Sequence, residues 1–315
     1  MAEADLEALA TTVRTAPGLL AKRHLELVEM LDAGIDGDDA ALIPHGDEHL
    51  VMCGEAIAPA FVASDPRAAG AAAVVTNVSD IRAMGGRPLA IVDMIVSPDR
   101  GHASAVLDGL GWASRLLGVP IAGGHLTLGH PPALSASCTG VVRRPLRASA
   151  ARPGDVLLAA FSLEGAYLTD DGAFFSSLQA RSPDLLRTDG DALVDVAERG
   201  LCHAARDVSM PGVAGSLLQM IETAGCGAVL DIDRLPRPAG VALERWLLTF
   251  PSFGFLLAAP PSQAEAAQAV FAAHGLACAP CGAFEAGRAL RLAAGSSSVE
   301  VWDLAREPLT RTAQP

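Results

Sequence analysis

Residues 75–88 read VTNVSDIRAMGGRP, and this stretch decides the fold. Asn77 and Asp80 are three residues apart, so they share one face if the stretch is helical. The segment leading into it begins with Asp65 followed by a proline, the residue types preferred at the N-cap and first position of a helix. We predict a helix from Asp65 to about Met84, ended by two glycines. Its polar pair either caps a neighbouring element or reaches into a site.

Strands and helices alternate on both sides of this helix. In the first half we predict two short helices between Asp5 and Leu31, strands at 50–53, 89–96 and 134–142, and a helix with the apolar stripe Val106, Leu110, Ala113 and Leu117, ended by Gly118. In the second half we predict helices at 191–205, 212–224 and 263–273 and strands at 228–232 and 253–258. The alternation indicates an α/β fold.

The chain length of 315 residues is typical of two domains. A polar, turn-rich segment between Arg143 and Asp155 interrupts the alternation. We place the domain boundary there, which gives domains at 1–147 and 148–315.

The net charge of −13 would repel a nucleic-acid backbone, so we expect no nucleic-acid partner. A small anionic substrate stays compatible with this charge, because a bound divalent cation can reverse the local sign of a site. The N-terminus has no signal-peptide pattern, and no apolar run is as long as a membrane span. We therefore expect a cytoplasmic protein without a membrane partner, and reduced thiols at its six cysteines.

Gly37-Asp38-Asp39-Ala40 places two adjacent carboxylates in a tight turn, within a loop that we predict from Gly34 to Ala40. Both carboxylates can then point at one cation, and magnesium prefers such oxygen ligands. Aspartate-rich turns are more often solvated surface, so this motif needs support from others.

Two further motifs give that support. In AGGHLT, residues 122–127, a predicted strand ends in two glycines whose N–H groups can approach a phosphate closely; an ordinary strand-to-loop turn is the alternative. In RDVSMPG, residues 206–212, Asp207 precedes a helix and either completes a metal site or caps that helix. The Cys278-Ala-Pro-Cys281 pair favours a structural role, because no second pair lies at zinc-site spacing.

The order of GDDAA, VTNVSDIRAMGGRP, GVPIAGGHLT, ARPGD and ARDVS resembles the superfamily of aminoimidazole ribonucleotide (AIR) synthetase, thiamine-monophosphate kinase, selenophosphate synthetase and the hydrogenase maturation factor HypE. The resemblance covers about residues 30–235, and the N-SD-AMG-P pattern is its most specific part. The chain is most similar to the AIR synthase-related branch, to which FPSFGF at 250–255 also belongs.

This resemblance implies an N-terminal domain whose strands form a β-barrel across a homodimer, and a C-terminal α/β domain. It implies that ATP and Mg²⁺ are bound. By position, the magnesium ligands would be Asp38, Asp39, Asp80 and Asp207, and the contacts to the nucleotide would be Asn77, a turn at Gly123 and Gly124, and Thr127. Carboxylates converging on a triphosphate require bridging divalent cations.

The chain departs from the family pattern at three positions. Glu55 in Cys53-Gly54-Glu55 stands where kinase-like members have an aspartate, and we expect it to replace that metal ligand. His125 replaces the aspartate of a Gly-Gly-Asp-Thr motif, which removes a fixed charge and adds an imidazole that titrates near neutrality. Met210 stands where a second aspartate is expected, and thiamine-phosphate chemistry is not supported.

Two functions are compatible with these residues. The first is an ATP- and Mg²⁺-dependent enzyme that activates a small-molecule substrate by phosphoryl transfer, kinase- or synthetase-like, with His125 as the catalytic acid/base or phosphate contact. The second is a nucleotide-binding maturation or regulatory protein of the same fold without turnover, which the altered ligands favour.

Overall fold

A computed structural model describes residues 2–31, 37–170 and 172–310. The chain packs into two compact units. Unit 1 comprises Met1–Asp38, Pro145–Ala180 and Asp195–Pro315, and unit 2 comprises Asp39–Arg144 and Arg181–Val194. One border between the units, at Arg144 and Pro145, lies in the turn-rich segment where we predict the domain boundary. Two further segments, Met1–Asp38 and Arg181–Val194, belong to the unit that is formed mainly by the other half of the chain.

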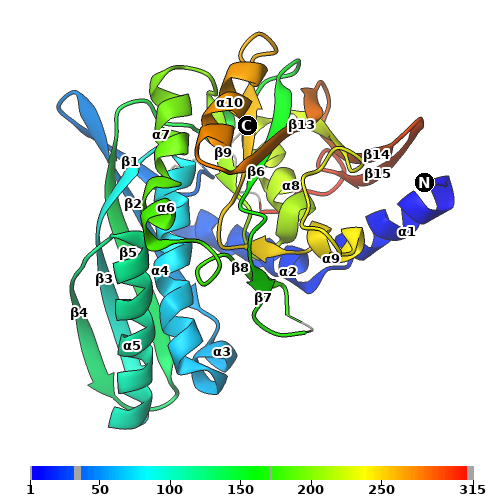
Figure 1. Cartoon of the computed structure of the whole chain (residues 1–315). Coiled ribbons are helices and arrows are strands. Elements are labelled where there is room, and N and C mark those ends of the chain that lie inside the picture. The colour runs from blue at the N-terminus through cyan, green and yellow to red at the C-terminus, as the bar shows by residue number, and fades with distance from the viewer. Residues whose placement is uncertain (1, 32–36, 171, 311–315) are drawn as a thin grey trace. The chain divides into compact units, whose positions relative to one another are not determined.

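Unit 2 is built on a five-stranded sheet in the order β1-β2-β5-β3-β4 (Figure 1). The strands are β1 (Ala41–His45), β2 (Glu48–Ile57), β3 (Arg87–Ser97), β4 (Ile121–Leu128) and β5 (Ala133–Val142). Neighbouring strands are antiparallel except β3 and β4, which are parallel. The β3–β4 connection contains a helix, as parallel pairing requires.

Helices α3 (Pro59–Ser64), α4 (Pro66–Ala83) and α5 (Arg100–Leu117) cover one face of this sheet, and α6 (Pro183–Thr188) packs on α5. The Asp65 carboxylate accepts a hydrogen bond from the Ala68 N–H and caps α4, whose first residue is a proline. Gly118 ends α5 in the left-handed conformation. The capping residues therefore set both helices where the sequence predicts them.

Unit 1 contains a seven-stranded mixed sheet in the order β15-β14-β10-β13-β6-β12-β9. Its strands are β6 (Val156–Phe161), β9 (Ala204–Asp207), β10 (Gly227–Asp231), β12 (Gly254–Ala259), β13 (Ala277–Glu285), β14 (Ala289–Ala294) and β15 (Ser297–Asp303). A second sheet joins β11 (Phe250–Pro251), β8 (Phe174–Ser176) and β7 (Ala166–Tyr167). Every residue of β12 is buried, so both faces of the large sheet are covered at its centre.

The helical elements of unit 1 are α1 (Glu3–Arg14), α2 (Pro17–Leu20), η1 (Ala21–Leu31), η2 (Ala148–Ala150), α8 (Gly212–Ala224), α9 (Leu243–Leu247) and α10 (Ala264–Ala273). The border between the units falls within α7 (Asp191–Glu198). Phe161 and Phe175 each make an edge-to-face contact with Trp246 in the core. Aliphatic residues of β6 and α8 complete this core.

Most predicted elements are confirmed, and two predictions are wrong. The chain at Ala204 and Ala205 is strand β9, paired with β12, and the preceding helix α7 ends at Glu198. Gly123 and Gly124 lie inside β4 instead of ending a strand. Part of the predicted 34–40 loop, residues 34–36, lies outside the described residues.

All six cysteines are free thiols, as predicted, and four of them are buried. Among the described residues, no helix is both long and apolar enough to cross a membrane.

Candidate functional site

The polar pair of α4 lies in the interior of unit 2. Asn77 is fully buried and Asp80 is 7% exposed. Both come close to Cys53 on β2, whose strand partner on β5 is Cys138. The pair therefore points toward the sheet, as a shared helix face requires.

The bonds of Asn77 are local. Its Nδ2 donates to the Ala73 carbonyl at 2.8 Å, and the Cys53 thiol donates to the Asn77 carbonyl at 3.3 Å and to Asn77 Oδ1 at 3.4 Å. Burial, with the nearby Asp80 carboxylate, raises the pKa of the Cys53 thiol far above its usual value. Cys53 is thus a protonated donor that holds the Asn77 amide beside Asp80.

The two glycines of β4 do not form the predicted phosphate-binding turn. A β-carbon on Gly124 would lie 2.6 Å from the carboxylate of Asp93 on β3, its partner in the parallel pair. Glycine is therefore needed at 124 to leave room for this carboxylate. Asp93 is 6% exposed, and burial raises its pKa. No atom lies within 4 Å of a β-carbon built on Gly123. A contact between the Gly123 N–H and a nucleotide stays a prediction.

His125 lies on the face of the sheet opposite α4 and α5, which we call the open face. Its strand partner is Met94, and successive residues of a strand alternate between faces. Its Nε2 is 3.1 Å from Oγ1 of Thr127, two residues further along the same face, and both side chains are exposed. The imidazole is thus available to a ligand on this face.

Asp38 holds a turn of unit 1 in place. Its Oδ1 accepts from the Ala148 N–H at 2.7 Å and its Oδ2 from Arg147 Nε at 3.0 Å, and its side chain is 2% exposed. The preceding residue, Gly37, accepts hydrogen bonds at its carbonyl from Arg206 and Thr223. The residue after Asp38, Asp39, is half-buried and belongs to unit 2.

Asp207 ends β9 in unit 1 and is 5% exposed. It does not cap α8, because the N-cap of that helix is Pro211. In unit 2, Glu55 is exposed on β2, on the same side of the strand as Cys53. Among the described residues, no group of three or more histidine, cysteine, aspartate or glutamate side chains is arranged to hold a metal ion.

Sequence reasoning did not assign Cys53 and Asp93 to the site. A usable pattern existed for each: Cys53 is two residues before Glu55 on one strand, so the two share a face. Asp93 is a carboxylate within an otherwise apolar strand, 89–96. Both would have been found by asking which residues alternate onto the helix-covered face.

Two family models match the chain. The N-terminal domain of AIR synthase related proteins matches residues 37–142, and the C-terminal domain of these proteins matches residues 152–295. An uncharacterised protein of Synechocystis, sll0787, is 38% identical over 87% of this chain and 85% of its own length. The chain therefore belongs to the AIR synthase related family, and it has the mixed α/β, two-domain architecture of that family.

More distant relatives carry names with a stated activity. The selenide, water dikinase of Myxococcus xanthus is 33% identical over 57% of this chain and 54% of its own length. The structure of T. maritima PurL complexed with ATP matches with a TM-score of 0.74 and 21% identity over 90% of this chain. The chain spans about half the length of these two proteins, covering 48% of the PurL chain.

Proposed function

We propose that this protein is an ATP- and Mg²⁺-dependent enzyme that activates a small-molecule substrate by phosphoryl transfer. One observation carries the proposal: the family's characteristic helix, α4, keeps the carboxylate of Asp80 almost completely buried beside Asn77. Carboxylates that ligate a metal ion are themselves held in place by neighbouring hydrogen-bonding groups. The similarity of the chain to a selenide, water dikinase and to PurL complexed with ATP supports nucleotide chemistry.

The residues of the chain fit magnesium in donor chemistry, since all five proposed ligands are carboxylates: Asp38, Asp39, Glu55, Asp80 and Asp207. They do not form a complete cage of their own among the described residues. Magnesium is commonly held by one or two carboxylates together with substrate phosphates and water. We therefore expect Asp80 to hold the ion with the nucleotide, which would neutralise charge on the transferred phosphoryl group.

The other proposed residues would position Asp80 or contact the nucleotide and the substrate. Asn77 would orient the Asp80 carboxylate, since its own amide is fixed by Ala73 and Cys53. Gly123 and Thr127 would contact the nucleotide on the open face of β4, whereas Gly124 admits Asp93 on the opposite face. His125, exposed on the open face, would contact the substrate and move a proton at its imidazole. A His125→Ala enzyme with normal turnover would exclude this role.

ATP binding and ADP release, measured separately, test the function. We expect Mg²⁺-dependent ATP binding, and ADP release that depends on a substrate from a panel of small phosphate acceptors. Asp47→Asn, a change in the exposed β1–β2 turn, is the matched control and should leave both unchanged. Tight binding without any ADP release would favour a maturation or regulatory protein without turnover.

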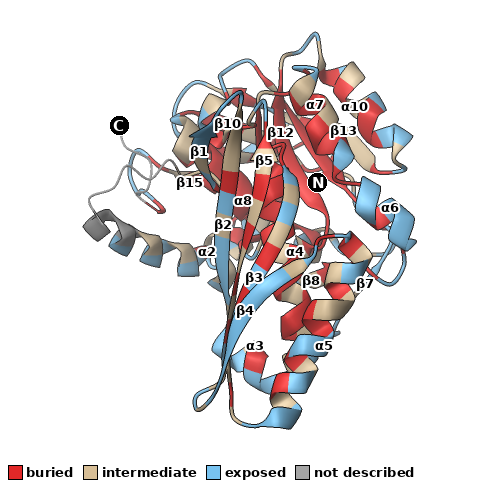
Figure 2. Ribbon diagram, turned by 90° about the vertical axis from the view of Figure 1, so that its left-hand side faces the viewer, coloured by how far each residue is buried: buried red, intermediate tan, exposed pale blue. Residues whose placement is uncertain are grey.

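We also propose that two copies pair through the open face of unit 2 over β2, β5 and β3, which would leave His125, on the edge strand β4, at the rim of the interface. Met52, Val92 and Met94 share this face with His125, and each of the three is 42–43% exposed. Figure 2 shows that the exposed and half-buried residues extend along β3 and on to the edge strand β4. Exposed apolar patches and open strand edges favour association. These features support the barrel-forming homodimer that the family resemblance implies.

Light scattering at micromolar concentration tests this pairing. We expect a dimer for the natural chain and a monomer for Met94→Arg, because a buried unpaired charge opposes association. Leu107→Arg is the control, since Leu107 is similarly exposed but lies on α5. A monomeric natural chain would contradict the proposal.

A further inference from the structure

Unit 2 contains a concave site apart from the proposed nucleotide contacts, on the side where α4 and α5 end. The cavity has a volume of about 240 Å³. It is lined by residues from the end of α4 and the start of β3, from the end of α5, and from the 181–194 segment; those used below are Arg82, Arg87, Gly118, Arg187, Gly190 and Asp191. None of these six is among the proposed nucleotide or metal contacts.

Arg82 is the most unusual lining residue, because it is a cation with only 5% exposure. Its Nη2 donates to the Leu186 carbonyl at 3.1 Å, but Nε has no hydrogen-bond partner within the described part of the chain. A guanidinium has five N–H donors, so this contact leaves most of them unused. A β-carbon at Gly190 would lie 2.2 Å from Arg82 Nε, so only a glycine lets this segment pack so closely against the guanidinium.

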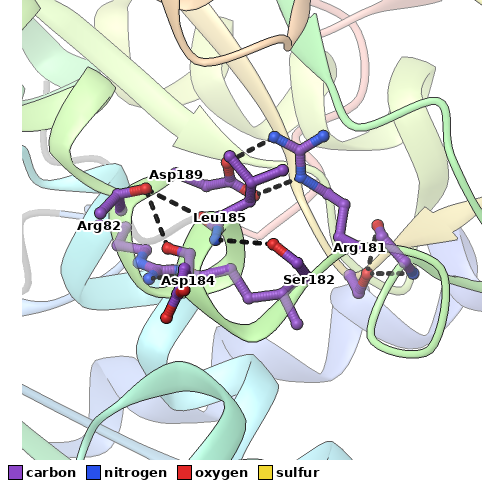
Figure 3. Close-up of polar contacts among 10 residues, drawn as sticks. Arg82, Arg181, Ser182, Asp184, Leu185 and Asp189 are labelled. Atoms are coloured by element: carbon purple, nitrogen blue, oxygen red, sulfur yellow. Dashed lines mark hydrogen bonds and ion pairs between the residues drawn. The ribbon is translucent and has the colours of Figure 1, made fainter.

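Arg82 also makes no ion pair among the described residues, although two aspartates are nearby. Asp189 is committed to Arg181, which donates to it from Nε at 2.8 Å and from Nη2 at 2.7 Å (Figure 3). Asp189 and, less strongly, Asp191 favour the charge of Arg82, but neither forms an ion pair with it in the described part of the chain.

Arg187 provides a second cation at the rim. Its Nη2 donates to the Arg115 carbonyl at 3.0 Å, and its Nη1 lies 3.5 Å from Asp184, whose side chain is 94% exposed. In the first contact, one of the five N–H donors of Arg187 caps the end of α5. The second contact is too long and too exposed to solvent to hold the remaining donors in place. A β-carbon at Gly118 would lie 3.1 Å from Arg187 Cγ, so this glycine lets the arginine lie across the cavity wall.

The balance of charge favours an anion. Three arginines, Arg82, Arg87 and Arg187, line the cavity, against one carboxylate, Asp191. The amino-terminal turn of α7 also opens onto it, and the positive end of that helix dipole favours negative charge. The carbonyl end of α5 acts in the opposite sense, but it carries only a partial charge and already accepts from Arg187.

We propose that this cavity binds a small phosphate-type oxyanion, either inorganic phosphate or the phosphate group of a small metabolite. Guanidinium groups recognise such groups through paired N–H donors. The cavity is below the usual size range for drug-sized ligands, so it suits a compact anion better than a nucleotide. Because its walls come from both α4–α5 and the 181–194 segment, a bound anion would stabilise their packing.

Calorimetric titration with inorganic phosphate tests the proposal, in buffer without magnesium or nucleotide and with ionic strength held constant by chloride. We expect one saturable site per chain. Arg187→Ala changes an exposed position and should weaken phosphate binding at least tenfold. The loss of one charge-assisted hydrogen bond to the anion accounts for a change of about this size in the dissociation constant. Asp191→Asn should tighten binding by about threefold, because it removes a repelling charge.

Two control variants distinguish this cavity from non-specific attraction to surface arginines and from the nucleotide site. Arg67→Ala removes an exposed arginine of α4 outside the cavity and should not change phosphate affinity. Asp80→Asn alters the proposed nucleotide site and should also leave it unchanged, so failure of the nucleotide proposal would not affect the result. If binding does not saturate by about 10 mM phosphate, the affinity is weaker than a specific site requires, and the proposal is overturned. Equal losses in Arg187→Ala and Arg67→Ala overturn it as well.

Discussion

Replacing Asp38 tests whether its carboxylate is mainly an anchor of unit 1. Its two oxygens accept from the Ala148 N–H at 2.7 Å and from Arg147 Nε at 3.0 Å. A buried hydrogen bond to a charged group contributes about 1.5–3 kcal/mol. The Arg147 side chain is 37% exposed, so that ion pair contributes at most about 1 kcal/mol. We expect a loss of about 3 kcal/mol for Asp38→Ala, from the sum of these two terms.

Asp38→Asn should cost less, about 1–2 kcal/mol, because one amide oxygen still accepts from Ala148 while the amide NH₂ faces Arg147. Urea unfolding followed by tryptophan fluorescence measures the free energy of unfolding. Asp47→Asn, in an exposed turn, should stay within about 0.5 kcal/mol of the natural chain. An Asp38→Asn protein with natural stability but no magnesium-dependent ATP binding would refute the anchoring role and assign the carboxylate to the ligand.

The remaining predictions concern buried groups. Asp189→Asn should destabilise by about 3–5 kcal/mol in urea unfolding, because Arg181 and Asp189 are both 1% exposed; Asp184→Asn is the exposed control. Glu222→Gln should cost about 2 kcal/mol, since this carboxylate accepts from the N–H groups of Leu309 and Thr310 and from the Thr310 hydroxyl. An unchanged melting temperature would contradict it. Burial raises the pKa of the Cys226 thiol from 9.0 to about 11, so its contribution to stability is complete below pH 9 and is lost as the pH rises to about 11. Cys226→Ala should reduce the slope of stability against pH in that window, and an unchanged slope would exclude the effect.

Local features of the sequence predict α4 well. A capping aspartate, a proline at the first position and a terminating glycine act within a few residues of the chain, and the helix follows them from Pro66 to Ala83. The same holds for α5, whose apolar stripe is buried. Elements of this kind depend little on what the rest of the chain does.

Distant partners decided the features that the sequence did not predict. The glycine at position 124, inside a strand, leaves room for Asp93 of the neighbouring strand. No local sequence pattern indicates this contact. β9 contains Arg206 and Asp207, and an arginine that bonds the Gly37 carbonyl looks like a solvated residue until that contact is known. For the same reason the anchoring of Asp38 by Arg147 and Ala148 could not be separated from metal binding.

Calorimetric titration of ATP tests the central claim most directly, with the natural chain and Asp80→Asn compared in magnesium and in EDTA. We predict saturable binding by the natural chain in magnesium, loss of binding in EDTA, and at least about tenfold weaker binding by Asp80→Asn. Binding of equal strength in all of these conditions, or no saturable binding by the natural chain at about 1 mM ATP, would contradict the account.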